Sequence, residues 1–347
     1  MRDRIAIAMS GGVDSLMAAA LLTEAGHEVF GLHFFSGFQG CKALPESLVR
    51  ACALLGMELF GVDLSAEFSA HVTDFFVSSY ARGLTPNPCM ACNRAVKFGA
   101  LLERARGMGA SRLATGHYAR LVEAPGGGRA LAKAMAGEKD QSYFLALVPK
   151  ERLALTEFPL GGLSKERVRA MAAERGLSGL VKTESQEACF LGDGSLREFL
   201  ELAGLAPCPG PIEDEAGKIL GTHQGVHAYT VGQRRGIGVP AATPLYVLEL
   251  DPARNRLIVG PEERLYARTA RVREINWLVA RPTDPLRVAA RIRYRHREAD
   301  ATLVPASDGS AALCFDHPQK AVTPGQGAVF YQGDRVLGGG WIENAAP

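Results

Sequence analysis

A glycine turn and three cysteines are the residues of this chain whose types and spacing are suited to chemistry. The turn at residues 10–15 reads SGGVDS, follows an apolar run and leads at once into a helical pattern. A turn between a strand and a helix N-terminus presents unpaired backbone N–H groups and a partial positive charge to an anion. Gly11 and Gly12 let the backbone approach a phosphate closely, and the hydroxyls of Ser10 and Ser15 add donors. The turn therefore predicts a phosphate site.

The turn belongs to neither of the commoner phosphate loops, because it lacks the Walker lysine and the G-x-G-x-x-G spacing. Its S-G-G-x-D-S pattern resembles the PP-loop of N-type ATP pyrophosphatases, which cleave ATP to AMP and pyrophosphate while adenylating a substrate. The alternative is an ordinary strand–turn–helix joint, and the complete pattern in this context argues against it.

The cysteines Cys89 and Cys92 lie in the stretch 85–93 (TPNPCMACN), where two prolines predict an extended loop before a helix. Because Cys92 is near a predicted helix N-terminus, we expect a depressed pKa and a larger thiolate fraction. The third, Cys189, lies in a polar stretch. Thiolates attack sulfur or bind metals, so these three are candidates for chemistry. Inert, buried thiols are expected at the other cysteines, which are Cys41, Cys52, Cys208 and Cys314.

The composition is that of an ordinary globular protein. The 347 residues are 47% hydrophobic and 22% charged, and their number predicts two or three domains. A net charge of +2 gives no argument for nucleic acid, so any basic surface must be local. Seven scattered cysteines do not form a secreted disulfide framework. With no apolar run of ~20 residues and no signal-peptide pattern, we expect a cytoplasmic protein without a membrane segment.

Alternating strands and helices position the turn. Strand patterns occur at 5–9, 29–34, 58–62 and 112–115, and helical patterns at 15–25, 45–56, 66–82 and 95–109. This order predicts an α/β fold with a doubly wound parallel sheet, whose ligands bind at the carboxyl ends of the strands. Residues 10–15 and 115–118 both follow strands, so we expect them at the same sheet edge. A further helix is predicted over 164–176, with a serine N-cap and a glycine C-cap.

The chain changes character after Gly204. Prolines at 207, 209 and 211 mark a boundary, and short strands follow. We expect a catalytic domain over 1–204, a small β-rich middle domain over 205–265 and a β-barrel-like domain over 266–347. Strands of the last domain are predicted at 271–277, 286–294, 299–305, 311–315 and 327–331.

Further short motifs stand in a specific order along the chain. They are Thr85–Pro88, Cys92-Asn93, Lys97-Phe98, Ala114–Ala119, Lys139–Leu145, Ser185–Gly192, His223–Gly225 and Tyr229–Gly236. With the PP-loop, this order resembles the tRNA-specific 2-thiouridylases almost end to end. That family places sulfur on C2 of the wobble uridine in certain tRNAs.

The resemblance implies a reaction and its residues. The uridine C2 oxygen attacks the α-phosphate of ATP, with Mg²⁺, and the resulting adenylate is a good leaving group. Cys189 corresponds to the persulfide carrier and Cys92 to the nucleophile, which end as a disulfide that a reductant restores. The implied ATP-binding residues are Ala8, Met9, Ser10, Gly11, Gly12, Val13, Asp14, Ser15, Phe34 and Gly116.

Cys89 departs from the family pattern, which has an aspartate with an acid–base role at this position. The chain instead carries Cys-x-x-Cys and a distant third cysteine. Cys89, Cys92 and Cys189 suit a [4Fe–4S] cluster with one open iron, which would deliver sulfide directly. The persulfide and cluster routes stay equally open, and a simple redox pair of Cys89 and Cys92 is a third reading. A zinc site lacks a fourth ligand.

The reaction also implies partners: the anticodon stem-loop of a tRNA, and a sulfur donor that is a relay protein, a desulfurase or sulfide. The base must be flipped into the site, where Asn87, Pro88 and His117 should contact it. Other tRNA contacts are implied at Lys139, Asp140, Gln141, Arg293, Tyr294 and Gln326. Alternating arginines at 291, 293, 295 and 297 predict one face of a strand as a phosphate ladder, against the alternative of a solvated edge strand.

Two other classes of function compete with this one. A different PP-loop ligase or amidotransferase would explain the turn at residues 10–15, but it gives the three cysteines no role. A non-catalytic tRNA-binding protein would explain the arginines but not the turn. Pyrophosphate release that depends on tRNA, rather than on ammonia or an amino acid, separates these classes.

Overall fold

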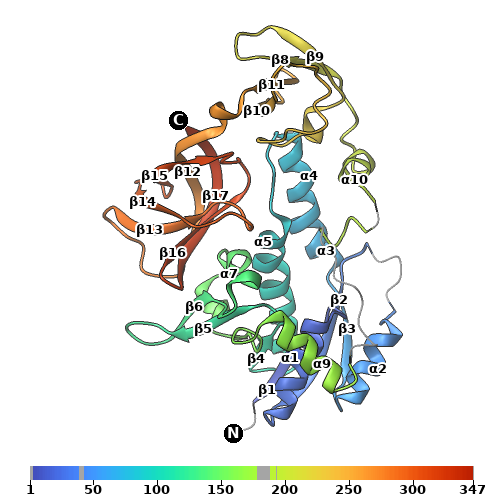
Figure 1. The fold of residues 1–347 in the computed structure, drawn as a ribbon. Coiled ribbons are helices and arrows are strands. Elements are labelled where there is room, and N and C mark those ends of the chain that lie inside the picture. Colours follow the sequence, from blue (N-terminus) through green and yellow to red (C-terminus); the bar gives the residue numbers. More distant parts are fainter. Residues whose placement is uncertain (1–2, 39–42, 178–187, 193, 347) are drawn as a thin grey trace.

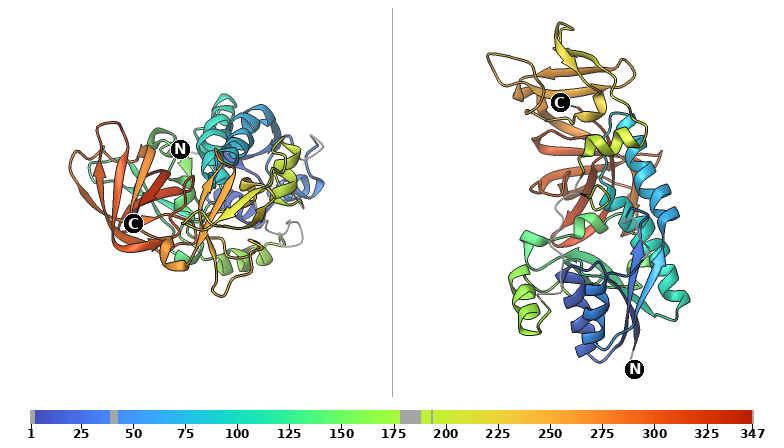
Figure 2. Two further views of the ribbon diagram at one scale, coloured as in Figure 1. Left: turned by 90° about the horizontal axis from the view of Figure 1, so that it is seen from above. Right: turned by 90° about the vertical axis from the view of Figure 1, so that its right-hand side faces the viewer.

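The computed structural model of the protein describes residues 3–38, 43–177, 188–192 and 194–346. Three parts are visible in Figure 1: a parallel sheet with its helices, a small antiparallel-rich sheet at the opposite end, and a closed barrel beside the central helices. The molecule is elongated, with the parallel sheet and the small sheet at its two ends (Figure 2). Cys41 and the predicted motif residues Ser185 and Gln186 lie outside the described residues.

The parallel sheet has the strand order β3-β2-β1-β4-β7, and every neighbouring pair is parallel. Its strands are β1 (Arg4–Ala8), β2 (Glu28–Phe35), β3 (Leu59–Asp63), β4 (Arg112–Ala114) and β7 (Thr156–Glu157). The chain runs outward from β1 to β3 and then returns to the other side of β1. The order therefore reverses between β1 and β4, where open α/β sheets bind their ligands. The predicted doubly wound parallel sheet is confirmed.

Helices cover both faces of this sheet because its strands are apolar on both sides. In β1, Ile5 and Ile7 join a core with α1, α2 and α9, whereas Ala6 joins a core with α3 to α6. The helices are α1 (Val13–Glu24), α2 (Glu46–Leu54), α3 (Ser65–Phe68), η1 (Ser69–Thr73), α4 (Asp74–Ala81), α5 (Pro88–Cys92), η2 (Asn93–Leu101), α6 (Leu102–Gly107), η3 (Gly137–Lys139), α7 (Ser142–Leu145), α8 (Lys150–Leu153), α9 (Lys165–Glu174) and α10 (Leu196–Leu202). As predicted, Ser164 caps α9, with its side chain accepting from the Arg167 N–H.

The barrel is closed by six antiparallel strands. They are β12 (Tyr266–Trp277), β13 (Leu286–Arg291), β14 (Ala299–Pro305), β15 (Ala311–Lys320), β16 (Gly327–Gln332) and β17 (Arg335–Ala346). Pairing of β12 with β17 closes the ring around an apolar interior. The hairpin of β5 (Ala119–Glu123) and β6 (Arg129–Lys133) pairs with β17 and so ties the first part of the chain to the barrel.

The strand β17 was not predicted, and it contains three consecutive glycines, a residue type that is unfavourable inside strands. Those glycines are required by close packing inside the barrel. A Cβ on Gly338 would lie 2.4 Å from the Asn276 carbonyl oxygen, and one on Gly340 would lie 2.5 Å from that of Arg273. Glycine therefore lets β17 approach β12 closely enough to close the ring.

The predicted arginine ladder is wrong. β13 ends at Arg291, and the residues that follow form turns rather than a continued strand. The turn is held by Arg293, whose Nη2 donates to the Ala321 carbonyl oxygen at 2.7 Å and to Thr323 Oγ1 at 2.5 Å. Arg291 is mostly buried and pairs with Asp140 at 3.0 Å. Only Arg295 and Arg297 remain exposed, so the four arginines do not share one face.

The middle part is a four-stranded sheet of order β10-β11-β8-β9. Its strands are β8 (Gly210–Glu213), β9 (Ile219–His223), β10 (Tyr246–Asp251) and β11 (Arg256–Gly260), and its short 3₁₀ helices are η5 (Val226–Ala228) and η6 (Glu262–Leu265). Ile212, Val247, Leu257 and Val259 fill a small core of its own. The predicted β-rich character of this segment is confirmed.

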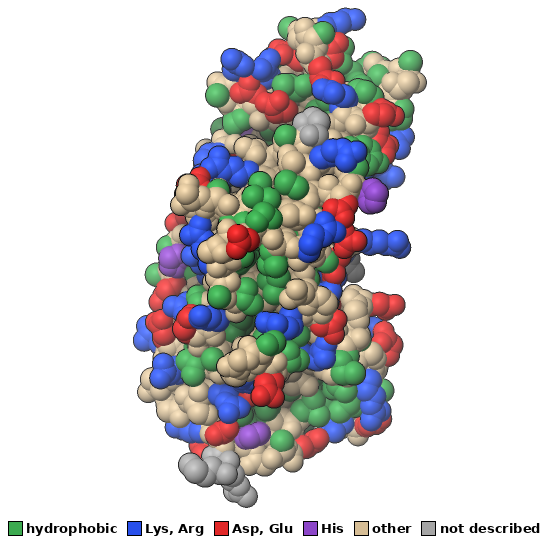
Figure 3. All heavy atoms as spheres, turned by 90° about the vertical axis from the view of Figure 1, so that its left-hand side faces the viewer, with side chains coloured by type: hydrophobic (Ala, Val, Ile, Leu, Met, Phe, Trp, Pro, Cys, Tyr) green, Lys and Arg blue, Asp and Glu red, His purple; other side chains and the backbone are tan. Residues whose placement is uncertain are grey.

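The surface mixes charges of both signs. Lys and Arg side chains are interspersed with Asp and Glu over the face in Figure 3, as the net charge of +2 suggests. Within the described ranges, no helix combines the length and apolar character needed to cross a bilayer.

Gly161 provides a test of how β5 is positioned. A Cβ at this residue would lie 2.0 Å from the Ala119 carbonyl oxygen, whereas one on the neighbouring Gly162 meets only the Met135 sulfur at 3.8 Å. We expect Gly161→Ala to destabilise the protein by about 1–3 kcal/mol, since backbone must shift, and Gly162→Ala to be nearly neutral. Thermal unfolding followed by circular dichroism measures both. Equal Tm values for the two variants would contradict this packing.

Candidate active site

The turn between β1 and α1 is shaped to receive an anion. Gly11 has a φ of +84°, and Gly12 is the N-cap of α1 without a side-chain cap. Ser15 Oγ donates to the Gly12 carbonyl oxygen at 2.9 Å and lies 3.2 Å from Ser10 Oγ. The two hydroxyls and the first N–H groups of α1 thus form one cluster of donors. This cluster fits a phosphate group.

Gly116 brings a second strand end against the same turn. It follows β4, and a Cβ there would lie 2.7 Å from the carbonyl carbon of Asp14 and 2.8 Å from the backbone nitrogen of Ser15. Only glycine permits this approach of two backbones. The expectation that residues 10–15 and 115–118 meet at one sheet edge is therefore confirmed.

Asp14 is held by residues that the sequence did not single out for this role. Lys165 at the start of α9 donates to both carboxylate oxygens at 2.8 Å, and the Tyr118 hydroxyl donates at 2.7 Å. The Lys165 side chain is only 3% exposed. A buried lysine next to a carboxylate keeps the turn in one conformation, and its removal would leave the Asp14 charge uncompensated.

A cavity of about 350 Å³ lies over the turn. Its lining includes the predicted residues Ala8, Met9, Ser10, Asp14, Ser15, Phe34, Gly116, His117, Gln141 and Cys189. Lys97, His33, Ser36 and Thr115 complete the lining. The structure thus brings seven of the ten expected ATP residues and one expected sulfur residue, Cys189, to a single cavity. The other three, Gly11, Gly12 and Val13, belong to the same turn but are not among the lining residues.

The predicted thiolate of Cys92 is wrong. Cys89 and Cys92 lie on α5, which begins at Pro88 and is capped by the Asn87 side chain accepting from the Met90 N–H at 3.2 Å. Cys92 is therefore the fifth residue of a helical segment that continues into η2, one turn beyond the free N–H groups at its start. Burial raises its pKa to about 12, while the positive charge of Lys97 acts in the opposite direction. Cys89 is exposed on the surface, and desolvation by the surrounding protein atoms raises its pKa.

The three thiols are neighbours without forming a metal-ligand set. The charge of Cys189 contributes to the raised pKa of both Cys89 and Cys92, so the three lie within electrostatic reach. Nevertheless, no group of three His, Cys, Asp or Glu side chains in the described part of the chain converges to hold a metal ion. The side chains as placed do not fit a [4Fe–4S] cluster, and we derive no step through one.

Magnesium lacks protein ligands in this cavity as well. Asp14 is the one carboxylate among the described lining residues, and both its oxygens already accept from Lys165. A Mg²⁺ ion that accompanies a triphosphate would therefore be held by phosphate oxygens and water, as is common for this cation.

An aromatic cluster positions Cys189 through its neighbour Phe190. The Phe190 ring is 6% exposed, whereas Cys189 itself is exposed at the cavity. The surrounding rings come from four segments: Phe199 on α10 at 5.0 Å between centroids, Phe76 on α4 at 5.1 Å, Phe68 on α3 at 6.0 Å and Phe38 after β2 at 6.1 Å. Burying such a side chain fixes the backbone on either side of it. Sequence reasoning missed Phe190 because its partners are distant in the chain.

The residues expected to contact the base or the tRNA occupy different environments. His117 lies in the cavity with Nδ1 2.8 Å from Thr115 Oγ1, and burial holds its pKa well below the usual range, so the ring is neutral. Gln141 Oε1 accepts from the Tyr118 N–H, and Lys139 is exposed. Asp140 is 2% exposed and accepts from Ser142 and Arg291.

The barrel residues expected to contact tRNA lie at the junction with α5. Gln326 Nε2 donates to the Thr85 carbonyl oxygen at 2.8 Å, which ties the barrel to the loop before Asn87 and Pro88. Tyr294 stacks on Phe144 of α7 at 4.3 Å, and Arg293 is held in its turn. These residues therefore form the wall between barrel and helices.

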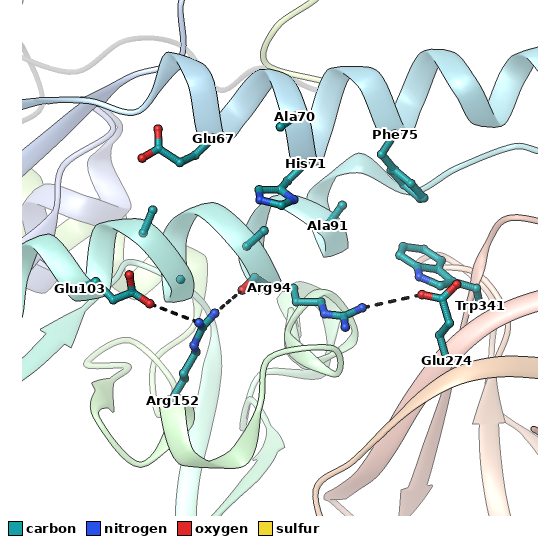
Figure 4. A pocket seen from close by; sticks show the side chains of 13 residues that line it. Glu67, Ala70, His71, Phe75, Ala91, Arg94, Glu103, Arg152, Glu274 and Trp341 are labelled. Carbon is teal, nitrogen blue, oxygen red and sulfur yellow. Dashed lines mark hydrogen bonds and ion pairs between the residues drawn. The ribbon is translucent and has the colours of Figure 1, made fainter. Parts of the chain in front are cut away.

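A larger cavity of about 640 Å³ lies on the other side of η2 and contains none of the predicted residues (Figure 4). Trp341 of the barrel faces Phe75 of α4 at 5.3 Å. Arg94 extends from η2 toward Glu274 at 4.0 Å, and Arg152 pairs with Glu103 at 3.3 Å. The arginines of this cavity are paired with glutamates, so their charges are already compensated. We therefore do not assign the phosphate site to this cavity.

Phe190→Ala tests whether the aromatic cluster positions Cys189. We expect oxidant-driven formation of the Cys92–Cys189 disulfide to slow by about tenfold, because small displacements of reacting atoms cost large factors in rate. Phe38→Ala removes a ring of the same cluster that is 46% exposed and should have a much smaller effect. Mass spectrometry of the disulfide over time gives both rates, and equal rates in the Phe190 variant and the unmodified protein would refute the positioning role.

Comparison with known proteins shows where this architecture is found. A family model described as a tRNA methyl transferase HUP domain matches residues 3–193. Models described as a tRNA methyl transferase PRC-barrel domain and an aminomethyltransferase beta-barrel domain match residues 197–261 and 267–342.

Curated relatives match nearly the whole chain. Proteins named tRNA-specific 2-thiouridylase MnmA from Geotalea uraniireducens and Geobacter metallireducens are each 45% identical to it. The alignments cover 99% of this chain and 96% and 98% of those proteins. The protein of that name from Chloroflexus aggregans is also 45% identical, over 97% of this chain and 98% of its own. The chain therefore belongs to the tRNA-specific 2-thiouridylase family.

Proposed function

We propose that this protein is a tRNA-uridine 2-sulfurtransferase that activates the C2 oxygen of the wobble uridine with ATP and replaces it with sulfur. The observation that supports this most strongly is the single cavity lined by both the PP-loop turn and Cys189. A phosphate turn alone suits many ATP-using enzymes, and a thiol alone suits many redox proteins. Activation followed by sulfur attack requires both at one carbon atom.

In the first step, the donors of Ser10, Ser15 and the α1 N-terminus hold the phosphates of ATP. The uridine O2 bonds to the α-phosphorus, the bond to the bridging oxygen breaks, and pyrophosphate leaves. The uridine N3 proton is lost in the same step. That proton passes to solvent, because burial and the charge of Lys97 hold the pKa of His117 well below its usual range and make it a weak base. The neutral His117 ring lines the cavity and is available to hydrogen-bond the base.

In the second step, the Cys189 persulfide supplies sulfur. Its terminal sulfur bonds to C2, and AMP leaves with the electron pair of the C2–O bond. The Cys92 thiolate then attacks the Cys189 sulfur, which forms a Cys92–Cys189 disulfide and releases 2-thiouridine. Because burial raises the pKa of Cys92, this last attack must occur from a small thiolate fraction. A dithiol reductant restores both thiols and completes the cycle.

We assign the partners and regions by the same reasoning. The catalytic domain is 1–204, the middle domain 205–265 and the barrel 266–347, with the tRNA anticodon stem-loop bound where barrel and helices meet. Asn87, Pro88 and His117 surround the flipped base. Lys139 is exposed and is available to contact the phosphate backbone of the tRNA. The sulfur donor approaches the exposed Cys189. We propose a cytoplasmic location, because the tRNA substrate is found there.

Separate cysteine variants test the two steps. Cys92→Ser and Cys189→Ser should each abolish thiolation while tRNA-dependent pyrophosphate release in a single turnover persists within about threefold, since neither thiol takes part in adenylation. The expectation of a buried thiol at Cys208 is wrong, because this cysteine is exposed. It lies outside the cavity, so Cys208→Ser serves as the matched control. Pyrophosphate and thiolated nucleoside are measured on the same samples.

Full thiolation by the Cys189→Ser variant would overturn the persulfide route. Pyrophosphate release that is indifferent to tRNA would overturn the proposed reaction itself. Iron and sulfide analysis of anaerobically purified protein adds an independent check, because the persulfide route requires a fully active preparation without iron.

A further inference from the structure

The candidate active site contains a cation, Lys97, that has no carboxylate partner among the residues that the structure describes. Lys97 lines the cavity together with Ser10, Gly116 and Cys189. Within the described ranges no hydrogen bond or ion pair engages its ammonium group. The other permanently charged lining residue, Asp14, is already paired with Lys165. A lysine in a partly enclosed cavity without a carboxylate partner indicates that the cavity receives an anion.

The π-helical form of η2 explains why Lys97 reaches this cavity. Hydrogen bonds in a π-helix join residues five apart, so Lys97 comes to the same side of the helix as Cys92, its N-cap residue. In an ordinary α-helix, residues five apart lie about 140° away from each other around the axis. The π-helix thus directs Lys97 toward the thiols and the phosphate turn. Such irregular helices occur frequently at functional sites.

The Lys97 ammonium group is close enough to influence both His117, which is expected to contact the base, and the cysteines of α5. Burial is the main cause of the lowered pKa of His117, and the charge of Lys97 lowers this pKa further. It also opposes the raised pKa of both Cys89 and Cys92. Lys97 therefore lies near the point where the base, the activating phosphate and the sulfur must meet.

We propose that Lys97 binds the phosphate that joins the nucleotide to the target base and stabilises it as it leaves. This inference rests on the proposed function. When sulfur bonds to C2, the C2–O bond breaks and its electron pair goes to the departing oxygen of AMP. The phosphate charge changes from one negative charge to two in this step. A fixed ammonium group next to that oxygen lowers the barrier by stabilising the developing charge.

Arg94 provides a matched control on the same helix. It lies three residues before Lys97, but its side chain points into the other cavity, toward Glu274 (Figure 4). Replacing Arg94 by methionine removes one positive charge, as Lys97→Met does. Unlike Lys97, Arg94 does not line the cavity over the phosphate turn. Effects on folding or on overall charge should therefore be shared by Arg94→Met and Lys97→Met, and effects on the leaving phosphate should not.

The experiment follows the α-phosphate in single turnovers with [α-³²P]ATP, an unmodified tRNA transcript with uridine at the wobble position, and a cysteine desulfurase with cysteine as the source of persulfide sulfur. We expect Lys97→Met to retain tRNA-dependent pyrophosphate release within about threefold but to release AMP about 100-fold more slowly. Label should therefore accumulate on the tRNA. Lys97→Arg should recover part of the AMP release, because it restores the charge but not the shape. Arg94→Met should match the unmodified protein.

Two results would overturn the inference while leaving the proposed function intact. The first is release of AMP by Lys97→Met at the rate of the unmodified protein. The second is an equal loss of pyrophosphate and AMP release with no label on the tRNA, which would limit Lys97 to ATP binding or folding. If the unmodified protein itself neither releases pyrophosphate nor labels tRNA, the proposed function fails instead.

Discussion

The close approach of two backbones at the switch point of the parallel sheet determines the rest of the site. Gly116 after β4 lies so near to Asp14 and Ser15 that a single added carbon would be 2.7 Å from the Asp14 backbone. This contact places His117 beside the N-terminus of α1 and leaves the cavity between them. Lys165 and Tyr118 then hold the Asp14 carboxylate and fix the turn. A phosphate site and a base site become adjacent because two strands of one sheet end together.

The thiols reach this site through the core that the sheet shares with α3 to α6. α5 carries Cys89 and Cys92, and an aromatic cluster around Phe190 packs the segment of Cys189 against α3, α4 and α10. Because Phe76 of α4 and Phe199 of α10 both belong to that cluster, the segment that carries Cys189 is packed against elements that are far apart in the sequence. The barrel is tied to the same region by Gln326 and by the β5–β6 hairpin. The proposed reaction thus depends on contacts within the catalytic part and between that part and the barrel.

Local patterns in the sequence predicted the sheet, the glycine turn and the β-rich second half, because strand alternation and turn residues act over short distances. The helix at 164–176 was predicted from its own residues. The pairing of its Lys165 with Asp14 was not predicted, because it joins residues that are 151 apart in the sequence. The depressed pKa of Cys92 was wrong because burial, a tertiary property, exceeds the effect of helix position. β17 was missed because its glycines are required by β12 across the barrel. Family resemblance supplied the reaction, which no single pattern in the chain contains.

The central claim is that the uridine oxygen is activated at the phosphate turn and then displaced by sulfur in the same cavity. Its most direct test uses tRNA whose wobble uridine carries ¹⁸O at C2. The AMP released during thiolation should contain one ¹⁸O atom in its phosphate for each 2-thiouridine formed. AMP without ¹⁸O, alongside normal thiolation, would contradict the account, because sulfur would then have entered without adenylation of that oxygen.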